Sequence, residues 1–430
     1  MKLSLKNIGK IGAASIEING ITVIAGENNT GKSTVGKALY SLFCAFYKIS
    51  DKIREERTES IFRYFTSGVW SVPTKVTVGR VRKLVEDICA DRDRYIDNPN
   101  ELKRTLEKLF ESQDIRDIFF HNLDKSSMEA VFNKVLSYLK LDDDSIKAYV
   151  FKKILLSEFR MQIGHFNSKV PNSALALEIH GNTDFEIEIY NDEYVNIKNS
   201  IEINSNLAYI EDPFVINELT DEAFYLSEYA ESHRLKLKEL LIYKRDRSLV
   251  GSVMEEMAVS EKLNHILDIL NGICEGKLAA TEDSYAYTSA ELEKPLALSN
   301  VSTGLKTFLI IKTLLSNGSI EEGGTIILDE PEIHLHPEWQ LLLAEIIVLV
   351  QKEFGVHVLL NTHSPYFLNA IEVYAAKYGV DDKCKYYLSA CENGIARIDD
   401  VTDNIEAIYN KLARPLHLLY CQGSKRTDSF

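Results

Sequence analysis

Residues 21–34 read ITVIAGENNTGKST, and this stretch constrains the fold more than any other part of the chain. The apolar run at 21–25 has the composition of a strand, and the later stretch VGKALYSLFCAFY has the apolar spacing of a helix. The loop between them matches the pattern GxxxxGK[ST] from Gly26 to Ser33. The sequence therefore predicts a strand, a glycine-rich loop and a helix, with backbone N–H groups of the loop curled around phosphate oxygens.

A loop of this type binds a nucleotide. In the pattern, Lys32 reaches the β- and γ-phosphates and the hydroxyl of Ser33 binds Mg²⁺. The predicted cofactors are accordingly ATP and Mg²⁺. The other loop positions predicted to contact the nucleotide are Gly26, Asn28, Asn29, Thr30, Gly31 and Thr34.

Two adjacent carboxylates follow a second apolar run in the stretch TIILDEPEIHLHP at 325–337. In a sheet built around such a loop, the strand end places Asp329 beside the Mg²⁺ held by Ser33. Glu330 is then positioned to orient or deprotonate the attacking water. Farther on, VHVLLNTHSPYF puts His363 just after another buried strand, where ligands of parallel sheets collect, and we expect it to contact the γ-phosphate.

The rest of the chain predicts an α/β fold with a mixed sheet and helical insertions. Residues 174–210 alternate apolar and polar residues between turns, which is typical of an antiparallel meander. From 296 onward, helical patterns alternate with strands at 326–328, 356–361 and 385–389, which indicates parallel pairing with helices on the sheet's faces. Residues 51–160 and 215–275 have mixed charges and helical spacing.

Composition limits the partners. The formal net charge of -15 argues against a nucleic-acid binder with charge over its whole surface, so any such contact must be local. The densest basic segment, 232–248, places Arg234, Lys238 and Arg245 on one helical face, and these could meet DNA or RNA. Six cysteines without a CxxC pair, and the lack of an apolar run of about 18 residues, favour a cytoplasmic protein without a membrane span.

Four motifs in this order resemble the Walker A, signature, Walker B with D-loop, and histidine switch of ABC-type ATPase heads: GENNTGKST, VSTGLKTF, TIILDEPEIHLHPEWQ and LLNTHSPYFL. More narrowly, the chain resembles the SMC-related ATPases of prokaryotic defence systems, close to the OLD family and to Septu-type (PtuA-like) subunits. The resemblance covers residues 1–50 and 290–370. It implies a head formed by 1–50, 161–214 and 290–430, with helical insertions at 51–160 and 215–289.

The resemblance also implies further site residues. In that family two heads sandwich two ATPs, so Ser302 and Gly304 would contact the γ-phosphate of the opposite head. The signature departs from LSGGQ at Thr303 and Leu305. Gln162 would approach Mg²⁺ and the lytic water, which makes it both a catalytic and a metal-site residue beside Glu330 and His363.

The leading hypothesis is an ATPase that pairs head-to-head on ATP and regulates a separate, HNH-type nuclease in antiviral defence, docked on the helical insertions. An OLD-type nuclease is the first alternative, but the stretch 371–430 is short for the TOPRIM domain expected there. Asp399, Asp400 and Asp403 therefore lack a further domain to complete a metal site. Further alternatives are a DNA-repair or chromosome-handling ATPase of SMC type, or a transporter ATPase.

Overall fold

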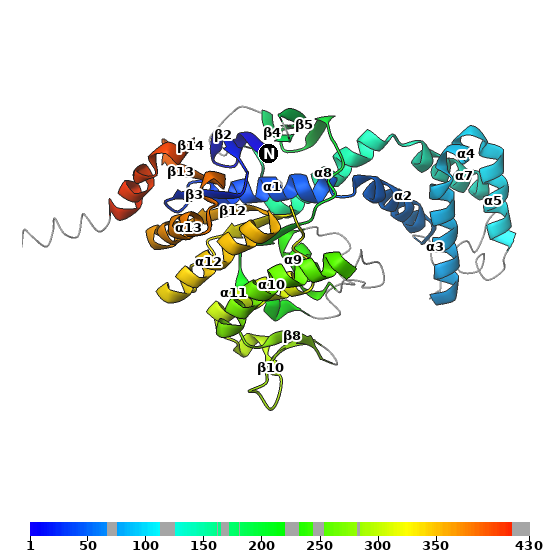
Figure 1. Cartoon of the computed structure of the whole chain (residues 1–430). Helices are drawn as coiled ribbons and strands as arrows, with labels where there is room; N and C mark the ends of the chain where they lie inside the picture. Colours follow the sequence, from blue (N-terminus) through cyan, green and yellow to red (C-terminus); the bar gives the residue numbers. More distant parts are fainter. Residues whose placement is uncertain are drawn as a thin grey trace, which may run out of the picture. The chain divides into compact units, whose positions relative to one another are not determined.

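The computed structural model describes residues 1–66, 75–111, 125–160, 162–164, 172–179, 181–219, 232–243, 253–281 and 284–414 (Figure 1). The chain divides into two compact units, the first made of Met1–Tyr47 with Phe151–Phe430 and the second of Lys48–Val150. The predicted fold class is confirmed, because the described residues combine a mixed sheet, an antiparallel meander and a helical insertion.

The first unit is built on an 11-stranded sheet, as far as the described residues show. In spatial order its strands are β6 (Tyr194–Asn199), β5 (Asn182–Tyr190), β4 (Asn172–Ile179), β1 (Lys2–Ile8), β2 (Ile11–Glu17), β14 (Ile395–Asp400), β13 (Cys384–Glu392), β3 (Ile21–Gly26), β12 (His357–Thr362), β11 (Thr325–Asp329) and β7 (Leu207–Ile210).

One end of this sheet is parallel and the other is largely antiparallel. β13, β3, β12, β11 and β7 pair in parallel with one another, whereas β2, β1, β4, β5 and β6 pair antiparallel with one another. Between these two sets, β14 pairs antiparallel with β13 and parallel with β2. The prediction that 207–210 belongs to the antiparallel meander is wrong, since Ile210 of β7 lies opposite Leu328 of β11 in a parallel pair. The spacing of apolar residues alone cannot distinguish parallel from antiparallel pairing in a run of four apolar residues.

Helices cover both faces of the parallel strands. On one face lies α1 (Lys32–Phe46), which contacts β3, β12, β11 and β7. Alternate residues such as Val23, Leu328 and Leu360 point to the other face. They pack there with apolar residues of α9 (His233–Ile242), α10 (Val253–Ile273), α11 (Thr303–Ser316), α12 (Pro337–Phe354) and α13 (Pro365–Tyr378). Figure 1 shows α12 and α13 side by side.

The second unit is helical, with its own core around Val85, Leu102 and Val135. Its described helices are α2 (Ile49–Thr66), α3 (Lys75–Ala90), α4 (Arg92–Asp97), α5 (Pro99–Glu111), α7 (Lys125–Lys140) and the first half of α8 (Asp143–Phe159). This unit ends at Val150, ten residues before the boundary expected from the sequence. Residues 215–289, expected as a second insertion, lie within the first unit.

Smaller elements complete the first unit. A 3-stranded sheet is formed by β8 (Lys277–Ala280), β9 (Tyr285–Thr288) and β10 (Leu296–Ala297). A 3-10 helix, Pro213–Glu218, follows β7, and three short ones span Leu298–Asn300, Asp381–Lys383 and Thr402–Asn404. Among the described helices, we find none with the length and apolar character needed to cross a membrane.

Candidate functional site

Residues 27–31 connect β3 to α1 as the sequence predicts. Gly31 has a φ of 88°, in the left-handed region that glycine adopts without strain, and α1 begins immediately after it. The ammonium of Lys32 is buried and donates to the carbonyl oxygens of Gly26 at 3.0 Å and Glu27 at 2.9 Å. The backbone of the loop therefore fixes this cation at the N-terminus of a helix, where anions are favoured.

The remaining loop residues differ in exposure. Asn28 and Asn29 are exposed, and the Asn29 side chain accepts a hydrogen bond from Lys10 Nζ at 2.6 Å. Thr30 is buried, whereas Thr34 in the first turn of α1 is half-buried. The side chains available to a ligand at this loop therefore belong mainly to its first half.

Asp329 ends β11 with a carboxylate that is only 5% exposed. The Asn361 amide donates to its Oδ1 at 3.0 Å, and the Tyr209 hydroxyl donates to its Oδ2 at 3.1 Å. Burial raises the pKa of Asp329, while hydrogen bonds from Ser33 and Asn361 oppose the rise. The sequence-predicted pair Ser33 and Asp329 is therefore brought into direct contact across two elements.

This pair fits the expected metal. Mg²⁺ takes oxygen ligands, and protein sites for it use one or two carboxylates together with substrate phosphates. The Ser33 hydroxyl and the Asp329 carboxylate meet beside the phosphate-type loop. These two residues would hold Mg²⁺ here.

The side chain of Glu330 lies between Lys32, which follows the glycine-rich loop, and His363, which follows β12. Its φ of 49° is unusual for a residue with a side chain, and its N–H donates to the Asn361 carbonyl at 2.9 Å. Its Oε1 lies 3.4 Å from Lys32 Nζ and 3.6 Å from His363 Nδ1. Three predicted site residues from neighbouring positions at the carboxyl ends of β3, β11 and β12 are thus within reach of one another.

A further acidic residue, Glu332, contacts Thr362 and His363 at the end of β12. Its side chain is 2% exposed, and its Oε1 accepts hydrogen bonds from the Thr362 hydroxyl and, at 3.3 Å, from the His363 N–H. The buried Oε2 has no hydrogen-bond partner within the described chain, and burial raises the pKa of the group. Sequence reasoning missed Glu332 because an acid in a turn ordinarily faces solvent.

The signature stretch forms the start of α11. Ser302 is its exposed N-cap residue, and its hydroxyl makes no capping hydrogen bond. Gly304 is buried, and a Cβ there would lie 3.1 Å from the ring of Trp339 on α12. The helix N-terminus thus presents Ser302, while Gly304 fits the helix against its neighbour.

The family model for the AAA domain described as "putative AbiEii toxin, Type IV TA system" matches residues 21–369, which span the loop, the signature stretch, the acidic strand end and His363. The chain belongs to this family. Its members' domain is an AAA-type ATPase domain, and in this chain the domain model also runs through the Lys48–Val150 unit.

Similarity to individual proteins is lower. The Retron Vc95 probable ATPase of Vibrio cholerae serotype O1 biovar El Tor is 20% identical over 388 residues, covering 85% of this chain and 70% of that protein. The SmcHead bound to the C-winged helix domain of ScpA has a TM-score of 0.46 and 11% identity, covering 93% of this chain and 97% of that one. The SMC head domain from Thermotoga maritima has a TM-score of 0.39 and 11% identity, covering 93% and 98%.

The structure places Gln162 next to the turn between β1 and β2, where a Cβ at Gly9 would lie 3.3 Å from the Thr34 side chain. It is exposed, and the next residues join the turn between β1 and β2: Ile163 accepts a hydrogen bond from the Gly9 N–H, and Gly164 pairs with Ile8. No contact within the described residues joins its side chain to the metal-binding pair. Its role at Mg²⁺ and water stays a prediction.

Glu211 is a residue that sequence reasoning missed. It directly follows β7, and the pairing of Ile210 with Leu328 brings it level with Asp329 on the neighbouring strand. Its Oε1 lies 4.0 Å from Lys37 Nζ, and its Oε2 lies 2.9 Å from the His233 ring. The hydrogen bond to His233 lowers the pKa of Glu211. Only the parallel pairing of β7, which the sequence did not reveal, brings this carboxylate to the site.

The proposed nucleic-acid contacts are not supported by the described cations. Arg234 pairs with Asp212 at 3.0 Å and with Glu218 at 2.9 Å, and Lys238 pairs with Glu218 at 2.6 Å. Cations held by neighbouring carboxylates add little attraction for phosphates, so a nucleic-acid contact through this face stays a prediction. Arg245 lies outside the described residues.

Proposed function

We propose that this chain binds ATP with Mg²⁺, hydrolyses it, and pairs head-to-head with a second copy when ATP is bound. The observation that supports hydrolysis best is the position of Glu330, whose Oε1 is 3.4 Å from Lys32 Nζ and 3.6 Å from His363 Nδ1. These residues sit at the carboxyl ends of adjacent parallel strands, where ligands bind in open α/β sheets. Membership in the AAA domain family supports the same activity.

Each residue has a defined task in this proposal. Lys32 neutralises the β- and γ-phosphates from within the loop, and Ser33 with Asp329 holds Mg²⁺, which neutralises charge on the phosphates. Glu330 orients the attacking water and accepts its proton, since its carboxylate is partly exposed beside Lys32 and His363. His363 contacts the γ-phosphate, and Glu332 holds its backbone N–H in place.

Pairing of two heads would complete each site. The Ser302 hydroxyl and the N–H groups at the start of α11 form an exposed helix N-terminus, which attracts anions. In the proposed pair these groups of one copy meet the γ-phosphate held by the loop of the other copy. The homo-oligomer is therefore at least a dimer in the ATP state.

Hydrolysis is tested with two variants of the purified chain. Lys32→Ala should abolish ATP binding, because no other buried cation of the described loop reaches the phosphates. Glu330→Gln should retain binding but lose turnover, since an amide cannot accept the proton. Binding is measured by calorimetry and turnover by phosphate release. Undiminished affinity in Lys32→Ala, or wild-type turnover in Glu330→Gln, would remove the residue from its assigned role.

The proposal extends to an effector. This chain is similar to a probable ATPase of a retron, Retron Vc95. This similarity supports the proposed place in antiviral defence. We propose that a separate nuclease, of HNH type as in Septu-like systems, docks on the helical unit Lys48–Val150. The nucleotide state then biases whether that nuclease is held or released.

The division of labour has a direct test. The chain purified alone should hydrolyse ATP yet leave plasmid DNA, single-stranded DNA and tRNA intact in Mg²⁺ or Mn²⁺. No group of three or more His, Cys, Asp or Glu side chains in the described parts of the chain is arranged to hold a metal ion. Robust cleavage that is lost on mutating an acidic residue of this chain would instead favour the nuclease alternative.

A further inference from the structure

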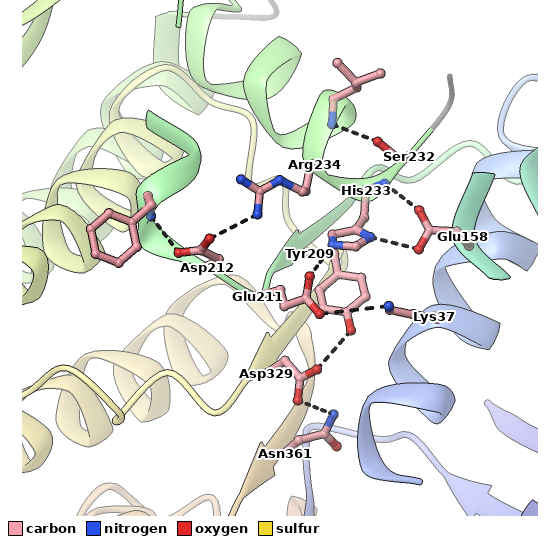
Figure 2. A network of polar contacts seen from close by, with 12 residues as sticks. Lys37, Glu158, Tyr209, Glu211, Asp212, Ser232, His233, Arg234, Asp329 and Asn361 are labelled. Carbon is pink, nitrogen blue, oxygen red and sulfur yellow. Dashed lines mark hydrogen bonds and ion pairs between the residues drawn. The ribbon is translucent and has the colours of Figure 1, made fainter. Parts of the chain in front are cut away.

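Hydrogen bonds and one ring-stacking contact lead from α8 to Asp329 (Figure 2). His233 begins α9 with a side chain that is 7% exposed. Its Nδ1 lies 2.8 Å from Glu158 Oε2 and its Nε2 lies 2.9 Å from Glu211 Oε2. Because ionised carboxylates only accept hydrogen bonds, both ring nitrogens must carry a proton to satisfy them. His233 is therefore held as an imidazolium between two glutamates.

The protonated state agrees with the surroundings of the ring. Burial disfavours the charged ring, but hydrogen bonds to Glu158 and Glu211 outweigh burial and raise the pKa of His233 to about 9. The His233 backbone N–H also donates to Glu158 Oε1 at 2.7 Å. Three hydrogen bonds to Glu158 and Glu211 thus fix the position of the His233 ring.

The fixed ring lies against Tyr209. Their ring centroids are 4.4 Å apart with an interplanar angle of 27°, which is the stacked arrangement that a cation and an aromatic face favour. The Tyr209 hydroxyl donates to Asp329 Oδ2, while Asn361 donates to Oδ1. Figure 2 shows His233, Tyr209 and Asp329 in sequence along this path.

Helix α1 closes the other side of Tyr209. Gly36 faces this side chain, and a Cβ at Gly36 would lie 3.0 Å from the Tyr209 hydroxyl oxygen and 3.2 Å from its Cζ. The phenol is therefore confined between the His233 ring and the helix that carries Lys32 and Ser33. Such confinement leaves the hydroxyl one position from which to donate to Asp329.

We propose that His233 is a positioning residue of the ATPase site: clamped by Glu158 and Glu211 and stacked on Tyr209, it sets the Tyr209 hydroxyl and thereby the orientation of the Asp329 carboxylate toward Mg²⁺. This inference rests on the proposed ATPase function. Residues that hydrogen-bond a metal-binding side chain fix its orientation, and their loss typically costs a factor of roughly 10 to 100 in metal affinity or activity.

The same contacts link the site to the helical unit through the chain itself. Glu158 lies near the end of α8, and α8 begins at Asp143 within the Lys48–Val150 unit. A shift of α8 that moves Glu158 releases one side of the His233 clamp.

The test compares Tyr209→Phe, His233→Gln and Glu158→Gln with wild type. Tyr209→Phe removes only the hydroxyl, so it keeps the packing even where a buried His233 variant folds poorly. We expect each variant to lower kcat roughly 10- to 100-fold, with KM for ATP within about threefold of wild type. His265→Gln is the matched control, because His265 is an exposed histidine on α10.

A second readout does not depend on turnover. In a Glu330→Gln background, Mg²⁺ is titrated at saturating ATP and the ATP-induced rise in Tm is recorded. The three variants should require roughly 10-fold or more Mg²⁺ for half of that rise, whereas His265→Gln should not. If the three variants match the control in kcat and in Mg²⁺ requirement while wild type shows Glu330-dependent hydrolysis, the positioning role of His233 is overturned and the proposed ATPase function stands. A wild type with neither hydrolysis nor ATP-induced stabilisation would overturn the proposed function as well.

Discussion

The charge of His233 should make the stability of the first unit depend on pH between about 6.5 and 9. The groups facing its ring are the carboxylates of Glu158 and Glu211 and the phenol rings of Tyr209 and Tyr40. The folded-state pKa is raised from 6.5 to about 9. A raised pKa means that the folded state binds the proton more tightly than the unfolded state. The stabilisation is therefore fully present below pH 6.5 and is lost as pH rises through 9.

The size of this effect follows from the shift. One pKa unit corresponds to about 1.4 kcal/mol, so the free energy of unfolding should fall by about 3 kcal/mol between pH 6 and pH 9.5 on account of this group. His233 is 7% and Glu158 1% exposed, so solvent screens this ion pair little, whereas Glu211 in the second pair is 34% exposed. With a urea dependence of about 3 kcal/mol per molar, this loss moves the unfolding midpoint by about 1 M.

The first unit offers its own fluorescent probe for the measurement. The sequence has 2 tryptophans, Trp70 and Trp339, so Trp70→Phe leaves Trp339 alone. Trp339 lies on α12, half-buried against the core of the first unit, with its ring 5.6 Å from that of Phe308. Urea unfolding followed by its emission therefore reports on the unit that contains His233.

The comparison that decides the matter is between variants. In this background, His233→Gln should be less stable than the His265→Gln control at pH 6, and the difference should narrow by pH 9.5. Taking the difference cancels the other groups that titrate in this range. A decline between pH 6 and 9.5 that is equally large in both variants would refute the assignment of the pH dependence to His233.

Three further predictions concern the nucleotide site. Ser302→Arg should leave ATP binding by one copy intact but prevent pairing, because the large cation would occupy the γ-phosphate position; light scattering with ATP in the Glu330→Gln background checks this, and persistent pairing would contradict it. Asp329→Asn should abolish hydrolysis and raise the Tm of the nucleotide-free protein, since burial disfavours the carboxylate; differential scanning calorimetry showing a lower Tm would contradict the burial argument. Gly36→Ala should lower kcat roughly tenfold by displacing Tyr209, whereas Gly272→Ala, at a helical glycine with open space around it, should not; equal rates in a phosphate-release assay would remove Gly36 from this role.

The phosphate-type loop and the acidic strand end could be predicted because both are local. The pattern from Gly26 to Ser33 fixes a turn and a helix start within eight positions, and carbonyl groups of the loop backbone hold Lys32. Asp329 and His363 could be placed together because the carboxyl ends of parallel strands meet at one edge of a sheet. The predicted class of fold follows from the same alternation of strands and helices.

The boundary of the meander could not be predicted. The run at 207–210 has four apolar residues, all buried, and such a run reads equally as an antiparallel or a parallel strand. Its true partner is β11, more than a hundred positions away. Without that pairing, nothing in the sequence places Glu211 at the site.

His233 illustrates a different limit. In the sequence it stands in a basic segment and is 75 positions from Glu158, so its pattern is that of a solvated helix start. Its place follows from charge balance at the folded site: Glu211 and Asp329 end adjacent strands at the same level, and the Glu211 charge raises the pKa of Asp329. A like charge nearby disfavours ionisation of a buried acid, and a protonated Asp329 could not serve Mg²⁺. The imidazolium lies against the Glu211 carboxylate and compensates its negative charge, while its ring stacks on Tyr209, whose hydroxyl donates to Asp329.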